Sequence, residues 1–137
     1  MELRRVVVTG LGALTPIGNT LSEFWKGLVS GQSGADYITY FDASNFKTQF
    51  ACELKGFDPE NFMDRKLSRK MDRFAQYAIV SSDEAIKDSL INLETIDKDR
   101  VGVIWGAGIG GLETLQNNVL DYAAGNGTPR FNPFMIP

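Results

Sequence analysis

Residues 101–115, VGVIWGAGIGGLETL, are the stretch that decides the fold class. An apolar run leads into four glycines (Gly106, Gly108, Gly110 and Gly111) and then into a helical pattern of apolar residues. An apolar run without alternation indicates a strand that is buried on both faces, as in a parallel sheet. A buried strand followed by a helix predicts an α/β fold.

The beginning of the chain repeats this pattern. Residues 4–9 form a β-branched run that ends at Gly10 and Gly12, which predicts another buried strand. Thr20 and Glu23 then have the spacing of a capping box. We therefore expect an amphipathic helix through residue 29.

Two more helices are expected further along the chain. Apolar residues at spacings of three and four predict one long helix over residues 66–90. A second helix is expected over about 111–124, and residues 48–54 have the pattern of a short edge strand. Two buried strands alone do not make a stable sheet, and the chain ends on the apolar residues 134–137. We therefore expect residues 1–137 to be one incomplete domain of a larger assembly.

Composition excludes several classes of site. The 137 residues carry a net charge of −3, and 43% of them are hydrophobic, as in a globular protein. The chain has no histidine, which excludes Ser-His-Asp triads and histidine-based zinc sites within it. Its one cysteine, Cys52, has no histidine or helix start beside it, so we interpret it as structural. No leader or membrane-spanning run is apparent, and we expect a cytoplasmic location without membrane insertion.

The glycines allow two interpretations. Gly106-x-Gly108-x-x-Gly111 matches the dinucleotide-binding pattern. A dinucleotide site also needs a second strand ending in an acidic residue about 20 residues on, and no such strand follows. Tight turns and close packing are the favoured explanation.

A basic cluster lies near the middle of this acidic chain. Five of its 14 Lys and Arg residues, at positions 65, 66, 69, 70 and 73, fall at helical spacing. Such a cluster is either a solvated helix face or a surface that attracts an acidic partner. No nucleic-acid-binding motif accompanies it, so a small acidic protein fits better than nucleic acid.

Four segments together resemble the amino-terminal part of a β-ketoacyl-acyl-carrier-protein synthase, most like the type II enzymes. They are RRVVVTGLGALTPIGNT, RKLSRKMDRFAQYAIV, GAGIGG and NPFMIP. The resemblance implies the amino-terminal portion of a thiolase-like fold, which has five α-β-α-β-α layers in the complete enzyme. It also implies a homodimer and an acyltransferase of fatty-acid synthesis that needs no cofactor.

The resemblance also implies roles for particular residues. Gly108 and Ile109 match the wall of the acyl-chain pocket, with Ile109 at the position that limits chain length. Met135 and Ile136 match positions that line the partner subunit's pocket. The basic positions Lys66, Arg69 and Lys70 match residues that dock acyl carrier protein.

The family reaction condenses an acyl thioester with malonyl-carrier protein and releases carbon dioxide. Its nucleophilic cysteine and two histidines follow the segment matched here, so the resemblance implies no catalytic or metal-binding residue in this chain, which should be inactive alone. Alternatives are a noncatalytic subunit resembling a chain-length factor, a polyketide ketosynthase subunit and, less favoured, a nucleotide-binding domain.

Overall fold

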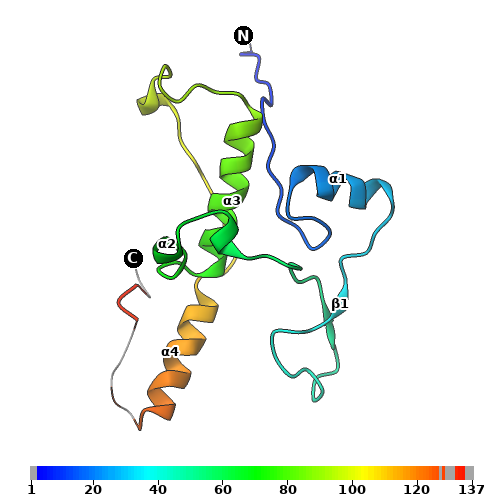
Figure 1. Ribbon diagram of the computed structural model, residues 1–137, viewed down its shortest axis with the longest axis vertical. Helices are drawn as coiled ribbons and strands as arrows, with labels where there is room; N and C mark the ends of the chain where they lie inside the picture. The colour runs from blue at the N-terminus through cyan, green and yellow to red at the C-terminus, as the bar shows by residue number, and fades with distance from the viewer. Residues whose placement is uncertain (1–2, 127, 129–131, 135–137) are drawn as a thin grey trace. The chain divides into compact units, whose positions relative to one another are not determined.

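The computed structural model describes residues 3–126, 128 and 132–134. Figure 1 shows the order of the elements along the chain. They are α1 (Leu21–Val29), β1 (Asp36–Tyr37), β2 (Phe50–Ala51), η1 (Pro59–Asn61), α2 (Arg65–Ser68), α3 (Arg73–Asp88), η2 (Lys98–Arg100) and α4 (Leu112–Ala124), where η denotes a short 3-10 helix.

The chain divides into two units. Residues 1–57 and 80–101 form the first unit, and residues 58–79 and 102–137 form the second. Residues 73–79 of α3 therefore belong to the second unit and residues 80–88 to the first. Within the described residues, no helix is both long and apolar enough to cross a membrane.

Helix α1 begins where the capping box predicts. The Thr20 hydroxyl accepts a hydrogen bond from the Glu23 N–H at 3.2 Å. The Glu23 carboxylate accepts from the N–H of Asn19 at 2.8 Å, one residue earlier than in the usual box. The first bond satisfies a backbone donor that the helix itself leaves without a partner, and the second holds the residue before the cap. The predicted helix is confirmed.

Two carboxylates of α3 hold the chain that leads into α1. Asp88 accepts from the N–H of Leu11 at 2.9 Å. Glu84 accepts from the N–H groups of Ala13 and Leu21, both at 2.8 Å. Charge-assisted bonds of this kind are stronger than neutral ones. They fix the segment between the first glycines and α1 against the first unit's part of α3.

The first glycines permit this packing. A Cβ atom at Gly12 would lie 2.0 Å from the carbonyl oxygen of Ser81 and 2.8 Å from the backbone nitrogen of Ala85. No other residue type fits there unless the backbone moves. Close packing, the favoured interpretation of the glycines, is therefore confirmed for this turn.

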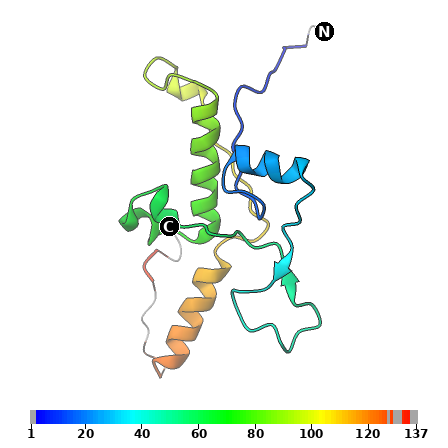
Figure 2. The same cartoon turned by 45° about the vertical axis from the view of Figure 1, so that its right-hand side comes forward.

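A two-stranded antiparallel sheet joins β1 and β2, with Asp36 opposite Ala51 and Tyr37 opposite Phe50 (Figure 2). The predicted edge strand over residues 48–54 is confirmed only at its centre. One further backbone bond extends the pairing, because the N–H of Ile38 donates to the carbonyl oxygen of Gln49 at 3.0 Å. The N–H of the next residue, Thr39, donates to the Glu53 carboxylate at 3.0 Å.

The prediction of one helix over residues 66–90 is wrong. The structure has α2 and α3, separated by residues 69–72. The Gln76 side chain is buried, and its amide donates to the carbonyl oxygens of Ser68 (2.9 Å) and Met71 (3.2 Å). These bonds hold the break in place, which the apolar spacing does not reveal.

The buried strands expected at residues 4–9 and 101–105 are not formed. Both stretches lack strand assignment, and the exposed fractions of Val6 and Ile104 are 88% and 98%. Among the described residues, the only buried hydrophobic side chains are Ala43 and Val80. A strand forms only when a neighbour accepts and donates its backbone hydrogen bonds, and the described residues supply none here.

Candidate functional site

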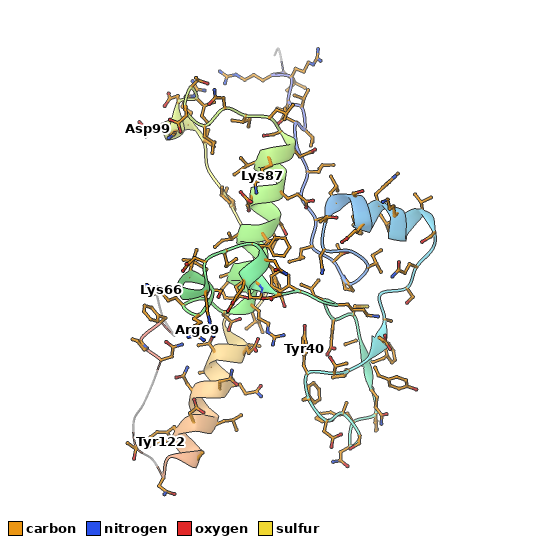
Figure 3. The ribbon with its side chains drawn as sticks, viewed as in Figure 1. Tyr40, Lys66, Arg69, Lys87, Asp99 and Tyr122 are labelled. Atoms are coloured by element: carbon orange, nitrogen blue, oxygen red, sulfur yellow. The ribbon has the colours of Figure 1, made fainter. Side chains whose placement is uncertain are left out.

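The residues expected to dock a partner lie on and just after α2. Asp64 caps this helix, because its carboxylate accepts from the N–H groups of Lys66 at 2.7 Å and Leu67 at 3.3 Å. Figure 3 shows Lys66 and Arg69 beside α2. Arg69 is the last residue of the turn, and its N–H donates to the carbonyl oxygen of Arg65 at 3.2 Å.

Two of the five clustered cations have carboxylate partners. The Arg65 guanidinium lies 3.1 Å from the Glu60 carboxylate, and that of Arg73 lies 2.8 Å from the Glu113 carboxylate. A cation that is already paired with a carboxylate of its own chain is less available to an acidic side chain of a binding partner. The cluster is therefore divided into engaged and available charges.

Lys66, Arg69 and Lys70 are all exposed. None of them forms an ion pair with any residue in the described part of the chain. The Lys70 ammonium instead lies 5.2 Å from the centre of the Phe134 ring, in cation–π contact. Lys66 and Arg69 thus present the most available positive charge of the cluster.

The glycines before α4 have specific structural uses. A Cβ at Gly110 would lie 2.9 Å from the Phe74 ring, so glycine allows the backbone to approach this side chain. Gly111 begins α4 with a φ of +74°, which L side chains rarely adopt. Within the described residues, no second strand follows α4 to complete a dinucleotide site.

The predicted pocket residues on this turn are open to solvent. The Ile109 side chain is 75% exposed, and nothing lies within 4 Å of a Cβ placed on Gly108. Met135 and Ile136 lie outside the described residues. The second unit therefore brings the docking cations and the glycine turn into one body, but its described residues do not enclose Ile109.

Asp72 connects the two helices that carry these residues. Its carboxylate accepts from the N–H of Thr114 in the first turn of α4 at 2.9 Å. Burial disfavours the charged form of Asp72, but hydrogen bonds from Thr114, Phe74 and Arg73 outweigh it and hold the pKa of this carboxyl below 3.8. The start of α3 is thereby linked to the start of α4.

Asn118 is a residue that sequence reasoning missed. It lies in the middle of α4, and its exposed fraction is 5%. Its side chain accepts from the N–H of Asn132 and donates to the carbonyl oxygen of Thr114, both at 2.7 Å. A polar residue in a helical pattern usually predicts a solvated position, so no sequence signal marks this one.

The first unit contains an open hollow of about 580 Å³ beside α1, and no predicted site residue lines it. Its lining includes Lys26, Gln32 and Lys55, but the Lys55 ammonium is paired with Asp36 at 2.8 Å. Cys52 is exposed, as a solitary thiol. The described residues contain no group of three or more Cys, Asp or Glu residues that could hold a metal ion.

The sequence matches the family described as "Beta-ketoacyl synthase, N-terminal domain" over residues 3–136. It is 46% identical over 140 residues to the 3-oxoacyl-[acyl-carrier-protein] synthase 2 of Synechocystis sp.. That alignment covers 100% of this chain and 33% of the relative, so the chain spans about one third of the relative's length.

Solved structures show the same likeness. The ishigamide ketosynthase/chain length factor matches with a TM-score of 0.77 and 28% identity, covering 96% of this chain and 33% of that one. A type II PKS acyl-carrier protein in complex with its ketosynthase, AntDE:AntF, matches with a TM-score of 0.70 and 27% identity, covering 93% and 34%. The expected fold class is confirmed: the chain has the α/β architecture found in the amino-terminal portion of thiolase-like synthases.

Proposed function

Because the chain belongs to the β-ketoacyl synthase family and matches its amino-terminal domain, we propose that it is part of a 3-oxoacyl-[acyl-carrier-protein] synthase of fatty-acid elongation. The observation that carries this proposal is the 46% identity to a 3-oxoacyl-[acyl-carrier-protein] synthase 2 over the whole chain. The polypeptide that contains these 137 residues together with the remaining family domains is called the complete synthase below.

In the proposed reaction, a cysteine thiolate takes the acyl group from its carrier thioester. Malonyl-carrier protein then loses carbon dioxide, and the resulting carbanion forms a carbon–carbon bond with the acyl carbonyl and releases the thiolate. The chain contains no histidine. Its one cysteine, Cys52, is exposed and does not occupy the place of the family's nucleophile, which follows the matched segment. This chain therefore contributes binding surfaces, and the reacting groups lie on other parts of the complete synthase.

The proposed partner is acyl carrier protein, which docks on Lys66, Arg69 and Lys70. Support comes from the exposure of these cations, from the lack of carboxylates paired with them in the described residues and from the carrier-protein complex of a structural neighbour. An acidic protein gains both attraction and orientation from such a surface. No cofactor and no nucleic acid are part of this proposal.

The proposed acyl pocket includes Gly108 and Ile109, with Met135 and Ile136 reaching the pocket of the partner subunit in a homodimer. The exposed apolar side chains of Ile109 and of residues 101–105 support additional polypeptide covering this region. We place the complete synthase in the cytoplasm.

The test is an assay of the complete synthase with acyl-carrier protein and malonyl-carrier protein. We expect release of carbon dioxide and a 3-oxoacyl product that is two carbons longer, as identified by mass spectrometry. The 137-residue chain alone is the control and should be inactive. A folded complete synthase that yields no such product would refute the proposal.

A polyketide subunit is the second candidate, favoured by the likeness to the ishigamide ketosynthase/chain length factor. Native mass spectrometry separates the two candidates. A homodimer that makes a single elongation supports the fatty-acid synthase, whereas an obligate pair with a different ketosynthase chain supports the second candidate.

A further inference from the structure

We infer that Phe134 is a positioning residue of the docking surface, where its ring holds the Lys70 ammonium ready for the carrier protein. The inference rests on the proposed function. The two residues belong to the same unit, and the ammonium lies 5.2 Å from the centre of the ring. That distance is typical of a cation–π contact. Both side chains are exposed, so an approaching partner can reach the pair.

An aromatic ring holds a cation in a different way from a carboxylate. The guanidinium groups of Arg65 and Arg73 each face a carboxylate, which cancels most of their charge. The Phe134 ring has no net charge, so the Lys70 ammonium keeps its full positive charge for an outside partner. An ammonium also has three N–H donors, and a ring on one side leaves donors on the other side for a carboxylate.

Hydrogen bonds hold the ring in its place. The Phe134 N–H donates to the carboxamide oxygen of Asn132 at 2.9 Å, which closes a tight turn. The Asn132 N–H donates in turn to Oδ1 of Asn118 at 2.7 Å, and Asn118 is a buried residue of α4. The segment 132–134 is therefore attached to α4, and both views in Figures 1 and 2 place it near α2.

The backbone of Lys70 is held as well. Its N–H donates to the carbonyl oxygen of Leu67, in α2, at 3.1 Å. The contact with Phe134 thus restricts a side chain whose two ends of attachment are already fixed. A free lysine side chain loses rotamer freedom when a partner binds it. A lysine that the protein has already restricted loses less, and this difference favours binding.

The first experiment measures the affinity of the complete synthase for acyl carrier protein by isothermal titration calorimetry. Phe134→Leu keeps an apolar side chain but removes the ring face. It should weaken binding about twofold to fivefold, which is the size of one exposed cation–π contact. Phe134→Tyr is the conservative control. It keeps the ring face and should bind as the unmodified synthase does.

A double-mutant cycle tests whether Phe134 acts through Lys70. In the Lys70→Met background, Phe134→Leu should have no further effect, because no ammonium remains for the ring to hold. Lys66→Met is the matched background, since it removes an exposed cation that lies on α2 itself. There Phe134→Leu should still weaken binding about twofold to fivefold.

A second variant serves if Phe134→Leu does not fold. Replacing Phe134 by pentafluorophenylalanine nearly keeps the shape of the ring, but the fluorine atoms withdraw the electron density that attracts a cation. This replacement should weaken binding as Phe134→Leu does, and it should also have no effect in the Lys70→Met background.

The possible failures can be distinguished. If the unmodified synthase does not bind acyl carrier protein, the proposed partner fails. If it binds but loss of the ring leaves the affinity unchanged or raises it, Phe134 does not prepare Lys70 for docking and this inference is overturned. An equal loss of affinity in the Lys70→Met background overturns it too, because Phe134 would then act on the fold of the segment and not on the lysine.

Discussion

Glycine at position 12 is required by the space around it. The backbone there lies directly against α3, where a Cβ would overlap the Ser81 carbonyl oxygen. At Gly102, by contrast, nothing lies within 4 Å of the corresponding position. The described residues thus require glycine at position 12 but place nothing against position 102.

We expect Gly12→Ala to lower the free energy of unfolding by about 1–3 kcal/mol, which is the usual cost of overpacking. Urea denaturation followed by circular dichroism measures this change. Gly102→Ala is the matched control and should differ from the unmodified chain by less than about 0.5 kcal/mol. Equal stabilities of the two variants would contradict the packing found here.

At Ile109, the prediction concerns the proposed acyl pocket. In the complete synthase, Ile109→Phe should reduce kcat/KM for long acyl primers by about tenfold or more, because the larger side chain would occupy their space. Short primers should be used at an unchanged rate. Assays with hexanoyl- and tetradecanoyl-carrier proteins measure both.

The control for this substitution is Ile91→Phe, at an exposed isoleucine in the other unit. It should leave both rates unchanged. If Ile109→Phe uses long and short primers equally well, Ile109 does not limit chain length.

At the scale of elements, the second unit depends on bonds between helix ends. The break between α2 and α3 places Asp72 at the start of α3, where its carboxylate reaches the first turn of α4. In a single helix over residues 66–90, the carbonyl oxygens of Ser68 and Met71 would accept from backbone N–H groups of the helix itself. The bond from Thr114 to Asp72 thus joins the residue before α3 to the first turn of α4.

Asp72 should make the stability of this unit sensitive to acid. Because its folded pKa lies below 3.8, the charged form is favoured by folding. The stabilisation is fully present above the unfolded pKa and is lost as the pH falls through the lower folded pKa. We expect the free energy of unfolding to fall as the pH decreases below about 4.

Urea titrations at several pH values measure this dependence. Asp72→Asn removes the titrating group and should reduce the slope below pH 4, although it also weakens the bond to Thr114 at neutral pH. An unchanged slope in this variant would show that other carboxylates cause the acid sensitivity.

At the scale of the whole molecule, the charge distribution matters more than the net charge. The chain is acidic, with a net charge of −3, yet five of its 14 Lys and Arg residues lie within residues 65–73. Arg65 and Arg73 already face carboxylates, whereas Lys66 and Arg69 do not within the described residues. An acidic partner should therefore depend most on the latter two.

Arg69→Glu should weaken binding of acyl carrier protein by the complete synthase about tenfold at low salt, because it places a carboxylate opposite an acidic partner. The salt dependence of the remaining affinity should decrease, since fewer opposite charges meet. Isothermal titration calorimetry at two ionic strengths measures both effects.

Lys98→Glu is the control for Arg69→Glu, because it makes the same change in net charge at η2, outside the cluster. It should leave the affinity within about twofold of the unmodified value. An Arg69→Glu variant with unaltered affinity at both salt concentrations would remove this residue from the docking surface.

The sequence by itself determined the features that depend on short-range interactions. The start of α1 follows from Thr20 and Glu23, which bond to backbone groups within four residues, and the start of α4 follows from Gly111, whose φ glycine tolerates. The position of the basic cluster and the family to which the chain belongs are likewise properties of residue order.

Tertiary structure decided what depends on residues far apart in the chain. The bonds from Thr114 to Asp72 and from Asn132 to Asn118 join segments 42 and 14 residues apart, and no periodicity encodes such pairs. The division of the cluster into paired and available cations also needed these positions. The strands expected at residues 4–9 and 101–105 failed for the same reason: a strand exists only through hydrogen bonds to a neighbour, and its own sequence shows its preference but not its partner.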